Sequence, residues 1–190
     1  MASTIKIITT PISYLAIKQP QKNWFDFILP LILSLITTAI ILFVDLKIKN
    51  IELFVSNGIV NVINGITQIL SGFYIASMAA IATFPNKELD KFMQGITPKY
   101  NGKKLTRRNF LIRLFGYLSF ICIVLYFYGG ISVYFSTFIV IEKYSELIKS
   151  IFCLTYFSVF FNMLLTTSLG LSFMISKLCE SENDFIPPKK

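Results

Sequence analysis

The chain has 190 residues, of which 54% are hydrophobic and 15% charged, and its mean hydropathy is +0.66. This composition excludes an ordinary soluble domain and predicts an integral membrane protein. The net charge of +8 therefore reports first on orientation in the membrane, and the absence of histidine removes the commonest general base and metal ligand.

Residues 1–23 contain three lysines and two prolines but lack the apolar core and cleavage site of a signal peptide. We expect a cytoplasmic or interfacial arm, with residues 12–17 lying on the membrane surface. The first span is predicted over residues 24–44. Near its inner edge, Asp26 should either reach headgroup water or form an ion pair with Arg113 inside the membrane.

The second span is predicted within residues 53–84, a charge-free stretch of more than 30 residues that ends before Pro85. As one helix it would extend about 50 Å, against a hydrocarbon core of about 30 Å. Polar or small side chains recur at steps of one, three or four residues, which places them on one helix face. These are Asn57, Asn61, Asn64, Gln68, Ser71 and Gly72, with Gly58 and Gly65 beside them.

Amide side chains are unfavourable in hydrocarbon, so this face should contact another helix or water. We expect a packing seam, within the bundle or between subunits, in which Asn162 of the fourth span is a hydrogen-bond partner. Pore lining is the alternative. The residues that would form the seam or the pore are Asn57, Asn61, Asn64, Gly65, Gln68, Gly72 and Asn162.

Residues 85–109 form the longest polar segment and carry seven basic side chains. Glu88 and Lys91 favour a short helix, whereas Pro98 and the Asn101-Gly102 pair break the chain. Direct nucleic-acid binding is not expected, because few aromatic side chains lie among the basic ones. The residues expected to contact a cytosolic partner or lipid headgroups are Lys99, Lys103, Lys104, Arg107, Arg108 and Arg113.

The third span is predicted over residues 110–128, with Gly129-Gly130 interrupting the helix before residues 131–141. An unbroken long helix is the alternative. The fourth span, about residues 150–176, has a weaker polar face that includes Asn162. Residues 177–190 are predicted to form a mobile polar tail in the cytoplasm.

The charge distribution predicts the topology of this all-α protein. With four transmembrane helices in residues 24–176 and both termini in the cytoplasm, 14 of the 18 basic residues lie inside, as the positive-inside rule requires. We therefore expect a multi-pass protein of a bacterial inner membrane, and we also expect it to form homo-oligomers. Its partners would be the bilayer, other copies of itself and a soluble cytosolic protein.

No motif for catalysis, for a cofactor or for a metal is present in the sequence. It lacks a Ser/His/Asp set, HExxH, a glycine-rich phosphate loop and CxxC, and its three cysteines do not match a zinc site or a disulfide framework. We therefore expect no enzymatic activity, no cofactor and no metal site.

In its size, its four spans with inside termini and its single basic loop running into LTRRNFLIRLFGYL, the chain resembles KwaA, the membrane component of the bacterial Kiwa anti-phage defence system. The resemblance transfers no functional residue. It implies an oligomeric inner-membrane sensor that recruits a soluble DNA-binding effector. The expected function is thus a non-enzymatic membrane sensor or scaffold for a cytosolic effector. The alternatives are a holin-like pore that uses the second span and, after it, a transporter subunit.

Overall fold

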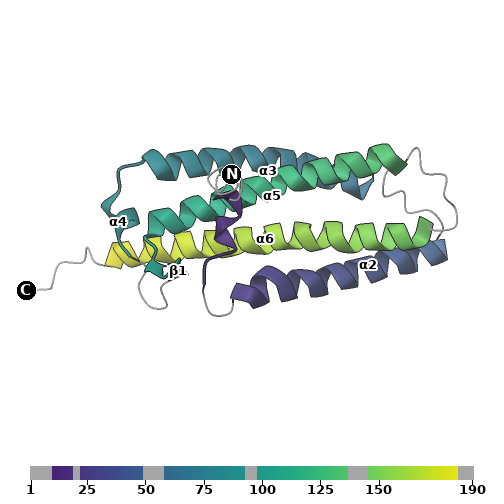
Figure 1. The fold of residues 1–190 in the computed structure, drawn as a ribbon, viewed down its shortest axis with the longest axis horizontal. Helices are drawn as coiled ribbons and strands as arrows, with labels where there is room; N and C mark the ends of the chain where they lie inside the picture. The colour runs from purple at the N-terminus through teal and green to yellow at the C-terminus, as the bar shows by residue number, and fades with distance from the viewer. Residues whose placement is uncertain (1–9, 19–21, 49–57, 93–97, 137–144, 184–190) are drawn as a thin grey trace, which may run out of the picture.

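The computed structural model describes residues 10–18, 22–48, 58–92, 98–136 and 145–183. Four long helical segments run side by side in an elongated bundle (Figure 1). They are η2 (Trp24–Ile28) continued by α2 (Leu29–Ile48), α3 (Ile59–Thr83), α5 (Arg107–Ser136) and α6 (Ser145–Asn183). Within the described residues, four segments are long and apolar enough to cross a membrane. The prediction of four candidate spans is confirmed.

The bundle consists of two helix pairs joined through α5 and α6. α3 packs along α5 and α2 packs along α6, while α5 and α6 contact each other. The core follows α5, where fully buried side chains recur every three or four residues and so share one face. These are Leu111, Leu114, Leu118, Cys122 and Leu125.

The structure differs from the sequence prediction at Gly129-Gly130, because α5 runs through both glycines without a break. The described residues form the alternative, a single unbroken helix. Glycine in a helix interior is unfavourable by about 1 kcal/mol relative to alanine, but at Gly129 the missing Cβ makes room for the side chain of Asn64 on α3. Helix packing therefore outweighs local propensity there.

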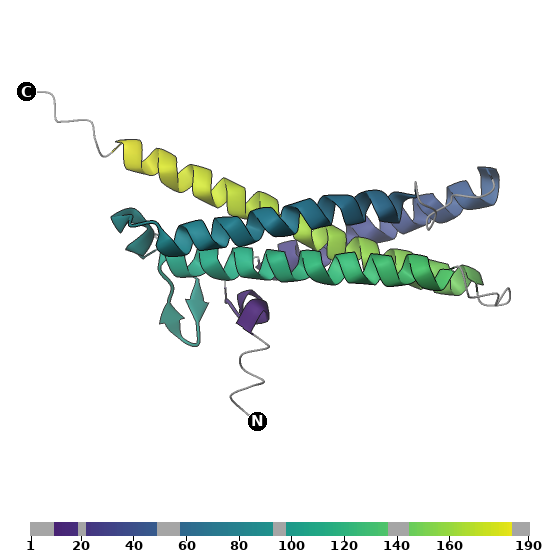
Figure 2. The same cartoon turned by 90° about the horizontal axis from the view of Figure 1, so that it is seen from above.

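The described residues between α3 and α5 include short elements of secondary structure. The predicted short helix is α4 (Lys87–Asp90), and it is followed by the antiparallel strands β1 (Lys99–Tyr100) and β2 (Lys103–Lys104). We call the end of the bundle where α3 ends and α5 begins the hairpin end. Figure 2 shows the β-hairpin projecting sideways from it, on the same side of α5 as the 3-10 helix η1 (Thr10–Tyr14).

The structure also differs from two predictions about the ends of the chain. The N-terminal arm packs on the bundle instead of lying only on the membrane surface, since Tyr14 and Ile17 are each 3% exposed. At the other end, α6 continues to Asn183, so residues 177–183 of the predicted mobile tail are helical. Residues 184–190 lie outside the described part of the chain.

Candidate functional site

The hairpin forms because the chain reverses direction at Asn101 and Gly102. Both residues have positive φ, 49° and 78°, and two consecutive left-handed residues make a tight turn whose twist matches that of a β-hairpin. Asn-Gly is the strongest short sequence signal for this turn. The sequence prediction used the pair only as a chain break and missed the two strands.

The N-terminal arm adds a third segment to this small sheet. The Lys18 N–H donates to the Lys99 carbonyl at 3.0 Å, and the Lys99 N–H donates to the Lys18 carbonyl at 3.2 Å. On α5, the guanidinium of Arg113 lies over the Tyr100 ring, 3.9 Å from its centroid, in a cation–π contact. The hairpin is thus held by both the arm and the bundle.

Four lysines of this sheet are exposed, and we call them the basic hairpin surface: Lys18, Lys99, Lys103 and Lys104. The four acidic side chains whose surroundings the structure describes are all paired elsewhere. The pairs are Asp26 with Lys22, Asp45 with Lys149, Glu88 with Lys91 and Asp90 with Arg108. The positive charge of the hairpin is therefore not balanced by these acids.

Arg107 and Arg108, two of the residues predicted to contact a cytosolic partner or lipid headgroups, make contacts within the protein. Arg108 donates to the carbonyls of Ile81 (2.5 Å) and Phe84 (2.9 Å), which are among the unpaired carbonyls at the end of α3. It also forms an ion pair with Asp90 at 2.7 Å, and this hydrogen bond lowers the pKa of Asp90. Arg107 is 6% exposed and lies 3.6 Å from Glu88. Both arginines therefore tie α5 to the segment that follows α3.

A second polar cluster lies inside the bundle, around the start of the first span. Pro30 has no N–H to donate to the carbonyl of Asp26, which would be its partner in a regular helix. The backbone is π-helical over Trp24–Ile28, and the Nδ2 of Asn162 on α6 donates to the Asp26 carbonyl at 2.5 Å. Tyr117 on α5 in turn donates to the Oδ1 of Asn162 at 2.7 Å. The cluster joins three of the four spans.

The carboxylate of Asp26 is buried and pairs with Lys22, so the structure shows neither predicted alternative, contact with headgroup water or an ion pair with Arg113. The Lys22 Nζ lies 3.1 Å from the Asp26 Oδ2 and donates to the Tyr14 carbonyl at 2.9 Å. The guanidinium of Arg113 instead lies over the Tyr100 ring. The i, i+4 spacing of Lys22 and Asp26 was the sequence signal for this pair, because such residues lie on one side of a helical turn.

Tyr14 connects the arm to the same cluster. Its ring stacks on that of Tyr117 with centroids 5.0 Å apart, and burial raises the pKa of its hydroxyl. Nothing in the sequence singled out Tyr14 or Tyr117, since a tyrosine near an apolar run is common at membrane interfaces.

The amide face of α3 divides between the inside and the outside of the bundle. Asn64 is buried, and the Tyr156 hydroxyl on α6 donates to its Oδ1 at 3.1 Å. The residue of α6 that bonds to the amide face is therefore Tyr156, and not Asn162 as predicted. Asn162 bonds to the Asp26 carbonyl instead. Of the other described members of the face, Ser71 is half-buried and Gly58 beside it is buried. The exposed members are Asn61, Gly65, Gln68 and Gly72. Asn57 lies outside the described residues.

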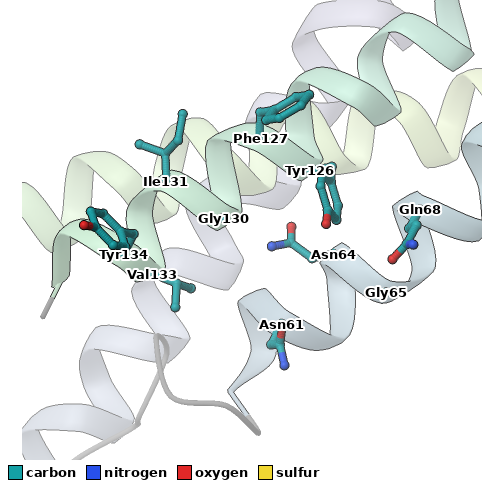
Figure 3. A pocket seen from close by; sticks show the side chains of 10 residues that line it. All are labelled: Asn61, Asn64, Gly65, Gln68, Tyr126, Phe127, Gly130, Ile131, Val133 and Tyr134. Carbon is teal, nitrogen blue, oxygen red and sulfur yellow. The ribbon is translucent and has the colours of Figure 1, made fainter.

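A groove between α3 and α5 lies beside these exposed residues, with a cavity volume of about 590 Å³. Figure 3 shows Asn64 reaching between the two helices next to Tyr126, with Asn61 and Gln68 one turn away on either side along α3. The lining contains amide and phenol groups but no charged side chain. It can exchange hydrogen bonds with an uncharged polar group.

Among the described residues, no group of three or more His, Cys, Asp or Glu side chains could hold a metal ion. Comparison of the chain with protein-family models, with curated proteins and with solved structures finds no match. The candidate functional features are thus two surfaces, the basic hairpin surface and the open part of the amide face.

Proposed function

We propose that the protein is a non-enzymatic, oligomeric scaffold of a bacterial inner membrane that recruits a soluble acidic protein to its cytoplasmic side. The observation that carries the proposal is the basic hairpin surface, where four exposed lysines lie on a small sheet. None of the four acids whose side chains the structure describes pairs with them. Such a surface attracts an acidic partner and orients it on approach.

The charge asymmetry of the whole sequence supports a cytoplasmic position for the hairpin, because the segment that contains it holds the largest group of basic residues. The resemblance to the Kiwa membrane component supports a role as a sensor in anti-phage defence, with a soluble effector as the recruited protein. The absence of any catalytic motif from the sequence agrees with a scaffold.

The test is affinity purification of the full-length protein from its native membrane, with a pair of matched variants. K103Q/K104Q removes two charges from the basic hairpin surface, and K47Q/K87Q removes two exposed charges away from it. We expect the hairpin variant to lose at least tenfold of one co-purifying acidic cytosolic protein, and the control variant to keep it. Equal recovery from both variants at equal membrane insertion would contradict the proposal.

The same lysines would also attract anionic lipid headgroups, each with about 1 kcal/mol near the surface. Phospholipid analysis of the same samples separates the two partners. If K103Q/K104Q loses bound anionic phospholipid but no protein, then the surface binds the membrane and recruitment through the hairpin is wrong.

A pore is the second candidate, and the exposed amides of α3 favour it because polar side chains at this depth suit contact with water. In liposomes of anionic phospholipid, a pore would release a small dye, and Q68L would reduce that release. Liposomes that retain the dye while the protein is oligomeric would exclude this candidate.

A further inference from the structure

The least hydrophobic span is also the least covered one. α3 has a mean hydropathy of 1.4, the lowest of the four spans, yet only 17% of its membrane segment is buried, against 50% for α5. The span containing α2 is similarly open, at 22%, but its mean hydropathy of 2.7 suits lipid. Within the described residues, α3 packs along α5, and its bonds to α6 come from side chains such as Tyr156, which donates to the buried Asn64 and leaves the open face uncovered. Lipid tails cannot form hydrogen bonds with the exposed amide of Gln68, so contact with another protein surface is more favourable than contact with lipid.

The open face of α3 has a regular seven-residue pattern. Small residues occur at Gly65, Gly72 and Ala79, and the positions between them at alternating steps of three and four are Asn61, Gln68 and Ile75. All six residues are exposed. A sustained alternation of three and four is the pattern of a helix that pairs with another in a left-handed crossing.

There is room for a second helix on this face. A Cβ built at Gly65 or at Gly72 meets no atom within 4 Å. Small residues at such positions allow two helix backbones to approach closely in a membrane. The groove beside them offers the hydroxyl of Tyr126 as a further polar contact.

We propose that α3 pairs in parallel with α3 of a second copy of this chain, along a seam formed by Asn61, Gly65, Gln68, Gly72, Ile75 and Ala79. All copies of a membrane protein with one topology cross the bilayer in the same direction, so their α3 helices are parallel. In a parallel pair with a seven-residue repeat, each seam position meets the same position of the other helix. A second copy of α3 therefore matches the seam position by position.

The chemistry of the seam matches this self-pairing. An amide carries both donors and an acceptor, so Gln68 can exchange hydrogen bonds with Gln68 of the other copy. The six positions have no charge, so two copies do not repel each other along the seam. This inference deepens the oligomeric part of the proposed function and does not depend on the recruitment of a cytosolic protein.

Cysteine cross-linking in native membranes tests the seam. In a variant whose three natural cysteines are replaced by alanine, single cysteines are placed at Gly65, Gln68 or Gly72. Control cysteines are placed on the same helix at Val62, Ile69 or Phe73, which are 59%, 64% and 64% exposed but lie on other faces. Under mild oxidation we expect disulfide-linked dimers at the seam positions, at least fivefold more than at the controls.

Two results would overturn the proposal: equal cross-linking at seam and control positions, or no cross-linking at any position in protein that is normally inserted. If the cysteine-free protein does not insert, the mass of the natural protein and of Q68L in detergent decides instead. We expect Q68L to shift the natural protein towards single chains and I69L to leave it unchanged. An unchanged mass in Q68L refutes the seam.

The variant K103Q/K104Q separates the two proposals, because it should still cross-link at position 68. Loss of partner recruitment with intact cross-linking contradicts only the hairpin proposal. Loss of cross-linking specificity with intact recruitment contradicts only the α3 seam.

Discussion

Two adjacent glycines in α5 give opposite predictions for the same substitution. A Cβ at Gly129 would lie 2.8 Å from the Nδ2 of Asn64 and 3.0 Å from its Cγ, and closer still to its Oδ1. A Cβ at Gly130 would meet nothing within 4 Å. G129A should therefore destabilise the bundle, whereas G130A should stabilise it.

The magnitude follows from three contributions. Overpacking a well-packed interior destabilises by about 1–3 kcal/mol. Asn64 is buried, so it has little room to move, and displacing it breaks the 3.1 Å hydrogen bond from Tyr156, which contributes about 1 kcal/mol. Replacing glycine by alanine in a helix stabilises the helix by about 1 kcal/mol. The net effect is about 1–3 kcal/mol of destabilisation for G129A and about 1 kcal/mol of stabilisation for G130A.

Thermal unfolding in detergent, followed by circular dichroism, measures this difference. For a chain of this size, 1 kcal/mol shifts the melting temperature by about 2–4 °C, so the two variants should differ by roughly 5–15 °C. N64A should relieve the overlap, so G129A should cost less stability in the N64A protein than in the natural one. If G129A is as stable as G130A, the close approach of α3 and α5 at this point is wrong.

Three further predictions concern the hairpin end and the Asp26 cluster. R108Q should lower the melting temperature by several degrees through loss of the bonds that join α3 to α5, whereas K104Q, an equal charge change on the exposed hairpin, should not. K22M should destabilise by about 3–5 kcal/mol because it leaves Asp26 buried without its cation, and K22M/D26N should recover most of that loss; equal stability of the single and double variants would contradict the pairing. Arg108 lowers the pKa of Asp90, so the stability from this pair is present at neutral pH and is lost below about pH 4, as the pH falls through the lowered pKa. The melting temperature of D90N should therefore fall less between neutral pH and pH 3 than that of the natural protein.

The four spans could be predicted because each is a long apolar run bounded by charges or prolines, and hydropathy alone identifies such runs. The end of the second helix next to Pro85 followed from the same reasoning, since α3 ends at Thr83. The break at Gly129-Gly130 was wrong because it relied on local propensity. The helix continues through these glycines because of the contact between Gly129 and Asn64. Asn64 lies on another helix, so the local sequence around Gly129 does not indicate this contact.

The sequence prediction located the charges but not their partners. It grouped six basic residues as one contact surface, and the structure separates them by role, with Arg108 joined to α3, Arg107 to Glu88 and Arg113 to a tyrosine ring. The three-dimensional course of the chain decides which cation reaches which acid. Of the six, only the three lysines of the hairpin are exposed, and Lys18 of the arm is exposed beside them.

The N-terminal arm explains how such a small hairpin can present its lysines in a fixed position. An isolated two-stranded hairpin is at best marginally stable in water, and here each strand has two residues. The arm pairs with the hairpin at Lys18 and with the bundle at Lys22, where the cation meets Asp26. Buried Leu105 and the contact between Arg113 and Tyr100 hold the other side. The basic hairpin surface is therefore anchored to the same buried cluster that joins three of the spans, and this anchoring fixes the position of its lysines relative to the bundle.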